Sequence, residues 1–154
     1  MSFDPNTPEI KIICESLIGC KININFTITF PSSEKHSGEI DDCKIMGNCL
    51  ENILFPIIQN YIPTFQKGPP GQKPDYLNIN KHYELKTFNR RDGPSFDIRS
   101  ITGYLNDISK ENGVQKELEI TYLVFEYVVV DEGFEIKKFW MLSVWELCCG
   151  YTPQ

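Results

Sequence analysis

The stretch that decides the fold is PDYLNINKHYELK, residues 74–86, which has the pattern of two short strands joined by a tight turn. Asp75 and Glu84 are equally distant from the middle of residues 79–80. A two-residue turn there, or a four-residue loop over NINK, gives the same register and sets residue 75 directly opposite residue 84. Asn80 is expected to adopt the left-handed conformation that such a turn often needs.

Three charged side chains should lie together on one face of this hairpin. Directly paired residues have Cβ atoms about 4.5–5.5 Å apart, and side chains along a strand return to the same face at every second residue. Asp75 and Glu84 are therefore expected to face each other, with Lys86 beside them. The intervening residues point to the opposite face and can join the core, namely Tyr83, Leu85 and Thr87.

Two carboxylates held face to face repel each other unless a cation lies between them. Mg²⁺ suits this position because it accepts one or two carboxylates, keeps several waters and leaves sites for phosphate oxygens. Lys86 at the edge can stabilise charge developing at phosphorus or hold the attacking water. The pattern thus indicates metal-assisted phosphodiester hydrolysis. The alternative is a solvated strand face with a weak ion pair, which is what most E-x-K triplets are.

The sequence on either side of the hairpin predicts an α/β protein. The predicted elements are, in order, a helix over 7–18, a strand over 21–30 with one buried face, a helix over 40–61 kinked at Pro56, the hairpin, a helix over about 95–110, a buried strand over 118–130, a strand over 134–142 and a short helix capped by Ser143. Residues 31–38 and 66–74 are expected to be loops. This order predicts a mixed central β-sheet flanked by helices.

Length and composition restrict the domain organisation, the partners and the location of the protein. At 154 residues a single domain, 1–154, is expected, with its core over about 40–150 and a helix and a strand within 1–39. The net charge of −6 argues against unselective coating of nucleic acid, although it allows a DNA enzyme with a local basic surface. No signal peptide or membrane span is indicated, because the N-terminus lacks a basic and apolar start and the apolar stretch 53–65 is short and contains two prolines. We therefore expect a cytoplasmic protein that has no contact with a membrane.

The cysteines favour free thiols. All six lie outside C-x2-C pairs, and neither histidine is grouped with them as a zinc ligand would be. Free, mostly buried thiols in a reducing compartment are the preferred interpretation.

Pro74-Asp75 followed by Glu84-Leu85-Lys86 resembles the signature of the PD-(D/E)xK nucleases, the restriction-endonuclease-like superfamily. The resemblance covers roughly residues 44–127. It implies that the hairpin lies in a mixed sheet flanked by helices, that Asp75 and Glu84 bind Mg²⁺, and that Lys86 is the catalytic lysine. Many members carry a further glutamate on the preceding helix, and Glu51 occupies that place in this sequence. The alternative for Glu51 is a solvent-facing acid on the helix.

A positive cluster follows the lysine strand. Arg90 and Arg91 lie in the predicted loop, and Arg99 lies in the following predicted helix. These arginines can bind DNA phosphates, or one of them can contact guanine with two hydrogen bonds. The alternative is a solvated loop without a DNA contact.

The leading hypothesis from the sequence is a Mg²⁺-dependent endonuclease of double-stranded DNA, most simply a type II restriction enzyme acting as a homodimer on a two-fold symmetric site. One alternative is a different nuclease of the same fold, such as a junction resolvase or a repair nuclease. Another is a non-catalytic DNA-binding or interaction domain whose hairpin charges form a surface ion pair. In that last case Lys86→Ala would leave the measurable properties of the protein nearly unchanged.

Overall fold

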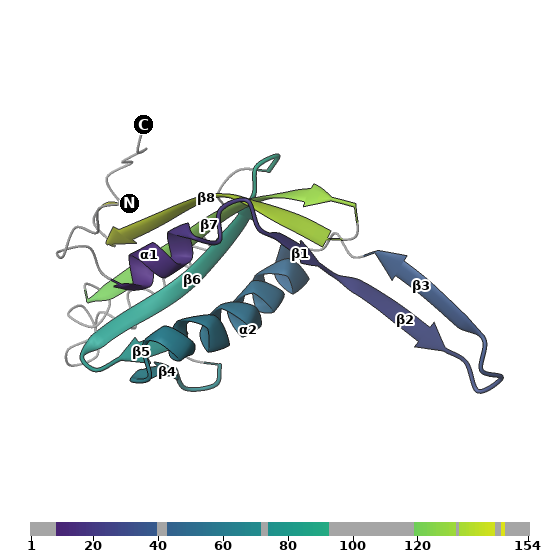
Figure 1. The fold of residues 1–154 in the computed structure, drawn as a ribbon, viewed down its shortest axis with the longest axis horizontal. Coiled ribbons are helices and arrows are strands. Elements are labelled where there is room, and N and C mark those ends of the chain that lie inside the picture. Colours follow the sequence, from purple (N-terminus) through teal and green to yellow (C-terminus); the bar gives the residue numbers. More distant parts are fainter. Residues whose placement is uncertain are drawn as a thin grey trace, which may run out of the picture. The chain divides into compact units, whose positions relative to one another are not determined.

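The computed structural model describes residues 9–39, 43–71, 74–92, 119–131, 133–143 and Glu146. Two helices and eight strands lie within them, in the following order (Figure 1): α1 (Glu9–Glu15), β1 (Lys21–Asn23), β2 (Asn25–Thr29), β3 (Lys35–Glu39), α2 (Cys43–Tyr61), β4 (Phe65–Lys67), β5 (Tyr76–Asn78), β6 (Lys81–Asn89), β7 (Ile120–Val130) and β8 (Gly133–Ser143).

Six of the strands form one sheet in the order β1-β8-β7-β6-β5-β4, and β2 and β3 form a separate two-stranded sheet. Pairing is antiparallel between β1 and β8, between β4 and β5, and between β5 and β6. The chain divides into two compact units whose segments alternate along the sequence. The first comprises residues 1–54, 87–94 and 125–139, and the second comprises residues 55–86, 95–124 and 140–154.

In the first unit, the segment that follows α1 is hydrogen-bonded to β8. The helix buries Ile10, Ile13 and Cys14. The amide of Gly19, whose φ of 86° favours glycine, donates a hydrogen bond of 2.8 Å to the carbonyl of Ile136 on β8. β1 then pairs with the start of β8, so the N-terminal helix and strand belong to the same unit as the strand that lies far along the chain.

The expectation of one strand over residues 21–30 with a buried face is wrong. The chain leaves the six-stranded sheet after β1, and β2 pairs with β3 in a separate two-stranded ribbon (Figure 1). In this ribbon Ile28 lies opposite His36. Ile28 is 52% exposed and Phe30 is 46% exposed. Residues 35–39, part of which was expected to be loop, supply the second strand of this ribbon. Alternation of apolar and polar residues indicates a strand, but it does not identify what covers the apolar face.

In the second unit, aromatic side chains hold the hairpin. Phe55 from the second half of α2 lies near Phe65 of β4 and Tyr76 of β5, with ring centroids 6.0 and 6.4 Å away. Phe65 also lies 5.1 Å from Tyr76 and 6.2 Å from Tyr83 of β6. Tyr83 and Leu85 are buried, as expected, and the cluster supports the face of the hairpin away from its charges.

Several predicted elements are confirmed with different bounds. α2 contains Pro56 as expected and buries Met46, Leu50, Leu54 and Ile58, although Tyr61 is 71% exposed. The buried strand near 118–130 is β7, which is third in the sheet, and the strand near 134–142 is β8. β4 was not predicted, because its residues lie at the start of a stretch rich in proline and glycine. The helix expected over about 95–110 lies outside the described residues.

Of the short helix expected after Ser143, Glu146 is the residue that the structure describes, and it forms the hydrogen bonds of a capping box with Ser143. The amide of Glu146 donates to the hydroxyl of Ser143 at 3.3 Å, and the amide of Ser143 donates to the carboxylate of Glu146 at 2.6 Å. The backbone donor from Ser143, together with its hydroxyl, lowers the pKa of Glu146 below its ordinary value. The hydrogen bonds expected of Ser143 as an N-cap are therefore present, while the rest of the predicted helix lies outside the described residues.

The thiols differ from one another in their environment. Cys14 is buried, which raises the pKa of its thiol well above the ordinary value, whereas Cys49 is half-buried and Cys20 is exposed. These three cysteines are free, but the expectation that the thiols are mostly buried is wrong for them. Within the described residues, no helix combines the length and the apolar character that crossing a membrane requires.

Candidate active site

The register of the β5–β6 hairpin is the predicted one. Tyr76 pairs with Tyr83, and Asn78 pairs with Lys81, which leaves a two-residue turn at 79–80. The left-handed residue is Ile79, with φ of 55°, and the expectation that Asn80 would take this conformation is wrong. A positive φ at the first turn position alone is the pattern of a type II′ turn, which favours glycine there.

Asp75 lies across from Glu84 when this register is continued by one residue beyond Tyr76. Its Oδ2 accepts a hydrogen bond of 2.7 Å from the amide of Leu85, which belongs to the peptide joining Glu84 to Leu85. The carboxylate of Asp75 is thereby held beside the backbone of β6. A charge-assisted bond of this length fixes both the position and the orientation of the group.

The other side of Asp75 is fixed by Gly68. The amide of Gly68 donates a hydrogen bond of 2.8 Å to the carbonyl of Asp75. A Cβ atom at position 68 would lie 1.7 Å from the carbonyl oxygen of Pro74, so the two backbones approach more closely than any side chain permits. The Pro74-Asp75 dipeptide is therefore held between β4 and β6.

Glu84 is a buried carboxylate with one oxygen in use. The residue is 4% exposed. Its Oε1 accepts a hydrogen bond of 3.0 Å from Nζ of Lys86, whose side chain is 35% exposed. Its Oε2 is buried and has no hydrogen-bond partner among the described residues. A buried carboxylate oxygen without a partner is costly, unless a cation binds it.

These residues fit a divalent cation of the Mg²⁺ type. Oε2 of Glu84 is an unused hard oxygen ligand, and the carboxylate of Asp75 is held next to the same peptide. No group of three or more histidine, cysteine, aspartate or glutamate side chains suited to a metal occurs in the described part of the chain. A site with two carboxylates leaves the other positions to water and phosphate oxygens, as Mg²⁺ prefers.

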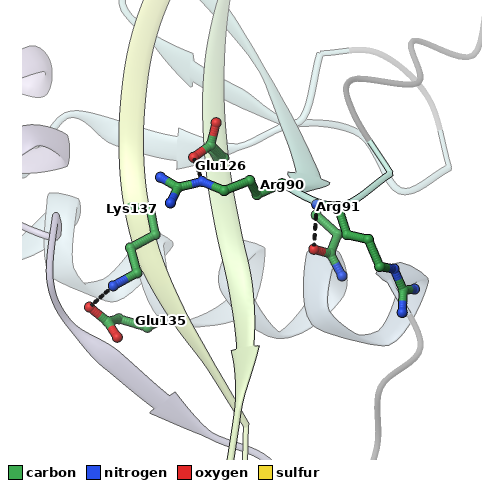
Figure 2. A network of polar contacts seen from close by, with 6 residues as sticks. Arg90, Arg91, Glu126, Glu135 and Lys137 are labelled. Atoms are coloured by element: carbon green, nitrogen blue, oxygen red, sulfur yellow. Dashed lines mark hydrogen bonds and ion pairs between the residues drawn. The ribbon is translucent and has the colours of Figure 1, made fainter.

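A second E-x-K triplet shows what an ordinary charged strand face looks like. Glu135 and Lys137 on β8 form an ion pair of 2.6 Å (Figure 2). The residue paired with Glu135 across the sheet is Lys21. The hydrogen bond from Lys137 and the charge of Lys21 hold the pKa of Glu135 below its ordinary value. Glu135 thus faces two cations, whereas Glu84 lies across from the carboxylate of Asp75 and accepts its hydrogen bond from Lys86. The residue across from the glutamate is therefore an acid at the triplet on β6 and a lysine at the triplet on β8.

The other predicted site residues are Glu51 on the helix and three arginines that follow the hairpin in the sequence. Glu51 is half-buried on α2 in the first unit, whereas Asp75 and Glu84 belong to the second, so its participation in the site stays a prediction. Arg90 and Arg91 follow the end of β6, and both are exposed. Arg99 lies outside the described residues.

One buried acid near the arginines was not identified from the sequence. Glu126 on β7 is 7% exposed and forms an ion pair of 2.6 Å with Nε of Arg90 (Figure 2). The signal that would have found it is an acidic residue in the middle of an otherwise apolar strand, because such a residue needs a buried partner.

The six-stranded sheet and its helices, with Pro74-Asp75 directly before β5 and Glu84-x-Lys86 on the adjacent antiparallel β6, are those of the restriction-endonuclease-like class of α/β folds. The solved structure of the NlaIV restriction endonuclease is similar, with a TM-score of 0.63 and 24% identity, over 86% of this chain and 53% of that one. The model of the NgoBV restriction endonuclease family matches residues 25–152, and the chain belongs to this family.

A curated relative is also named as a restriction enzyme. The type II restriction enzyme NlaIV of Neisseria lactamica is 28% identical over 110 residues, which are 67% of this chain and 44% of the relative. This chain spans about half the length of the relatives that it matches. The family match starts at residue 25 and so extends further toward the N-terminus than the stretch 44–127 on which the sequence resemblance depends.

Proposed function

We propose that the protein is a Mg²⁺-dependent type II restriction endonuclease that cuts double-stranded DNA at a specific site. The observation that carries this proposal is the buried, unpartnered Oε2 of Glu84, which lies across the hairpin from a second carboxylate, Asp75. Membership of the NgoBV restriction endonuclease family supports it, and so does the likeness to the type II restriction enzyme NlaIV.

The residues of the hairpin have separate roles. Asp75 and Glu84 would hold Mg²⁺, which when bound supplies a Lewis acid for the phosphodiester and lowers the pKa of a water molecule. Lys86 lies 3.0 Å from Oε1 of Glu84, where its ammonium can orient the attacking water or stabilise charge on the phosphate oxygens. In-line attack of water on phosphorus would break the P–O3′ bond and release a 5′-phosphate and a 3′-hydroxyl, which takes up a proton. Glu51 is proposed as a further member of the site.

Binding of DNA is assigned to the arginines after β6. Arg90, Arg91 and Arg99 are proposed to contact phosphates or bases of the duplex. A homodimer is proposed because two-fold symmetry places one active site on each strand of a symmetric recognition sequence. Analytical ultracentrifugation tests this part, and a chain that sediments as a monomer both alone and with DNA would contradict it.

The experiment that tests the function is digestion of plasmid and phage DNA by the wild type and Asp75→Asn, in Mg²⁺ and in chelator. Discrete fragments that need Mg²⁺ and disappear with Asp75→Asn are expected. Glu135→Gln is the matched control, because it removes an acid from the other E-x-K triplet, and it should cut as the wild type does. Cleavage restricted to branched DNA would point to a resolvase, and intact DNA under all conditions would contradict the proposal.

A further inference from the structure

Arg90 is held by the sheet at two points. Its amide donates a hydrogen bond of 2.9 Å to the carbonyl of Tyr127 on β7. Its side chain crosses β7, and Nε donates a hydrogen bond of 2.6 Å to Oε1 of Glu126 (Figure 2). Both contacts lie within the first unit. The backbone and the side chain of Arg90 are therefore fixed to the same strand, by neighbouring residues of that strand.

The two members of this pair differ in exposure. The side chain of Glu126 is 10% exposed, whereas that of Arg90 is 51% exposed. The pair thus joins a buried acid to a half-exposed arginine. Among the described residues, the side chain of Arg90 donates its hydrogen bond through Nε and not through Nη1 or Nη2. An arginine held in this way presents its two terminal nitrogens as a fixed pair of donors.

Arg91, the next residue, provides the contrast. Its guanidinium bonds the carboxylate of the adjacent Asp92 at 2.9 and 3.4 Å, and its side chain is 81% exposed. In Figure 2 it points away from Glu126. An exposed pair between sequence neighbours is screened by water and constrains the arginine weakly. Arg90 thus pairs with a buried acid of a neighbouring strand, whereas the pair of Arg91 with Asp92 is exposed on both sides.

We propose that Glu126 is a positioning residue, which holds Arg90 so that Nη1 and Nη2 together bind an acceptor pair of DNA. The proposal rests on the proposed DNA-cleaving function and deepens it. The acceptor pair is either N7 and O6 of a guanine or two oxygens of a phosphate, because both match the end of a guanidinium. Glu126 acts through Arg90 and does not contact the DNA.

The charge of the pair gives the proposal a measurable signature. A buried glutamate neutralises most of the long-range attraction between Arg90 and the phosphate backbone, and leaves a directional contact. Glu126→Gln keeps the shape and the acceptor oxygen but removes the negative charge. For this variant we expect the plot of the logarithm of the DNA-binding constant against the logarithm of the salt concentration to be steeper by about one unit. The reason is that one more positive charge is available to release a counterion from the DNA. A merely structural ion pair would not change that slope.

The test is a cycle of variants measured by fluorescence anisotropy on a labelled duplex pool with a randomised centre, in chelator so that no cleavage occurs. Arg90→Ala and Glu126→Ala are each expected to weaken binding about ten-fold, and the double variant no more than either single variant. Thermal unfolding is followed in parallel. If Glu126→Ala does not fold, Arg90→Met with Glu126→Leu replaces the pair by apolar side chains of similar volume and should fold without the DNA contact.

Sequencing of the fragments cut in Mg²⁺ distinguishes the two acceptors. Loss of preference at one guanine position in the Arg90 variant indicates base contact, and uniformly weaker cutting indicates a phosphate contact. Glu135→Gln is the control for removal of a paired acid from the same unit. A wild type that binds and cuts DNA, with unchanged affinity in Arg90→Ala or with additive losses in the double variant, overturns the role of Glu126 and leaves the nuclease function standing. A wild type that binds no duplex overturns both.

Discussion

Glu84 and Glu135 begin the same triplet of residue types, and each accepts a hydrogen bond from a lysine two residues later. The residues that lie opposite the two glutamates differ in the sign of their charge. Glu135 lies across from Lys21, whereas Glu84 is buried and lies across from Asp75. The charge that faces the glutamate, and its burial, therefore separate a candidate metal ligand from an ordinary strand residue.

Lys86 and Lys137 provide a matched pair for testing this difference. Lys86→Ala is expected to lower the rate of DNA cleavage by about 10²–10³-fold, because it removes a cation from the position of the developing charge. Lys137→Ala removes the corresponding lysine of β8 and should retain the wild-type rate. The measurement is the initial rate of plasmid nicking. Equal rates for the two variants would show that the triplet on β6 has no special role.

Ile79 stores backbone strain in the turn of the hairpin. A β-branched residue at a φ of 55° is unfavourable, and the side chain is 77% exposed, so it gains little from packing. We expect Ile79→Gly to raise the free energy of unfolding by about 0.5–1 kcal/mol, since relief of strain exceeds the greater entropy of the unfolded glycine chain. Denaturant unfolding measures the change. Asn80→Gly is the control and should give no gain, and a loss in Ile79→Gly would contradict the type II′ assignment.

The elements around the hairpin fix the position of Asp75 through backbone contacts. Gly68→Ala would place a methyl group against the carbonyl of Pro74 and separate β4 from residues 74–75. We expect a loss of about 2 kcal/mol in the free energy of unfolding, together with loss of cleavage at temperatures where the variant is still folded. Gly71→Asn is the control, since that position is open and asparagine tolerates its φ of 70°. A fully active Gly68→Ala would mean that Asp75 is not positioned by β4.

The capping box at Ser143 makes a pH-dependent contribution to stability. The folded pKa of Glu146 is lowered, so the ionised form stabilises the fold, and the contribution is complete above the ordinary glutamate pKa and lost as the pH falls through the folded value. Glu146→Ala should therefore lower the free energy of unfolding by about 0.5 kcal/mol at pH 7, a value reduced for exposure, and by less at pH 3. Denaturant unfolding of the wild type and the variant at the two pH values tests this. A difference in their free energies of unfolding that is larger at pH 3 than at pH 7 would contradict the prediction.

The sequence predicted those elements whose signals are local. Residues 74–86 contain the strand pattern, the turn and the matched spacing of the acids, so the hairpin register is as expected. β7 was predicted because a long apolar run is typical of a central strand. The partner of β2 was missed, because the alternation of apolar and polar residues indicates a strand but does not show which other segment it pairs with, here residues 35–39. Glu126 was missed because its partner, Arg90, is 36 residues away in the sequence.

At the level of the whole molecule, the family match covers residues 25–152 and includes the motif, both arginines and Glu126. The chain nevertheless spans about half the length of the relatives that it matches. Family membership and fold are established without reference to the individual side chains. The proposed metal site depends on three of them, Asp75, Glu84 and Lys86, and is therefore the part that requires its own measurement.

That measurement is a titration of the protein with Mn²⁺, which prefers the same oxygen ligands as Mg²⁺, followed by electron paramagnetic resonance. We expect the wild type and Glu135→Gln to bind the ion, and Asp75→Asn and Glu84→Gln to lose this binding while their thermal unfolding stays within a few degrees of the wild type. Binding of Mn²⁺ by Asp75→Asn as tight as by the wild type, or no binding by the wild type, would contradict a metal site between residues 75 and 84.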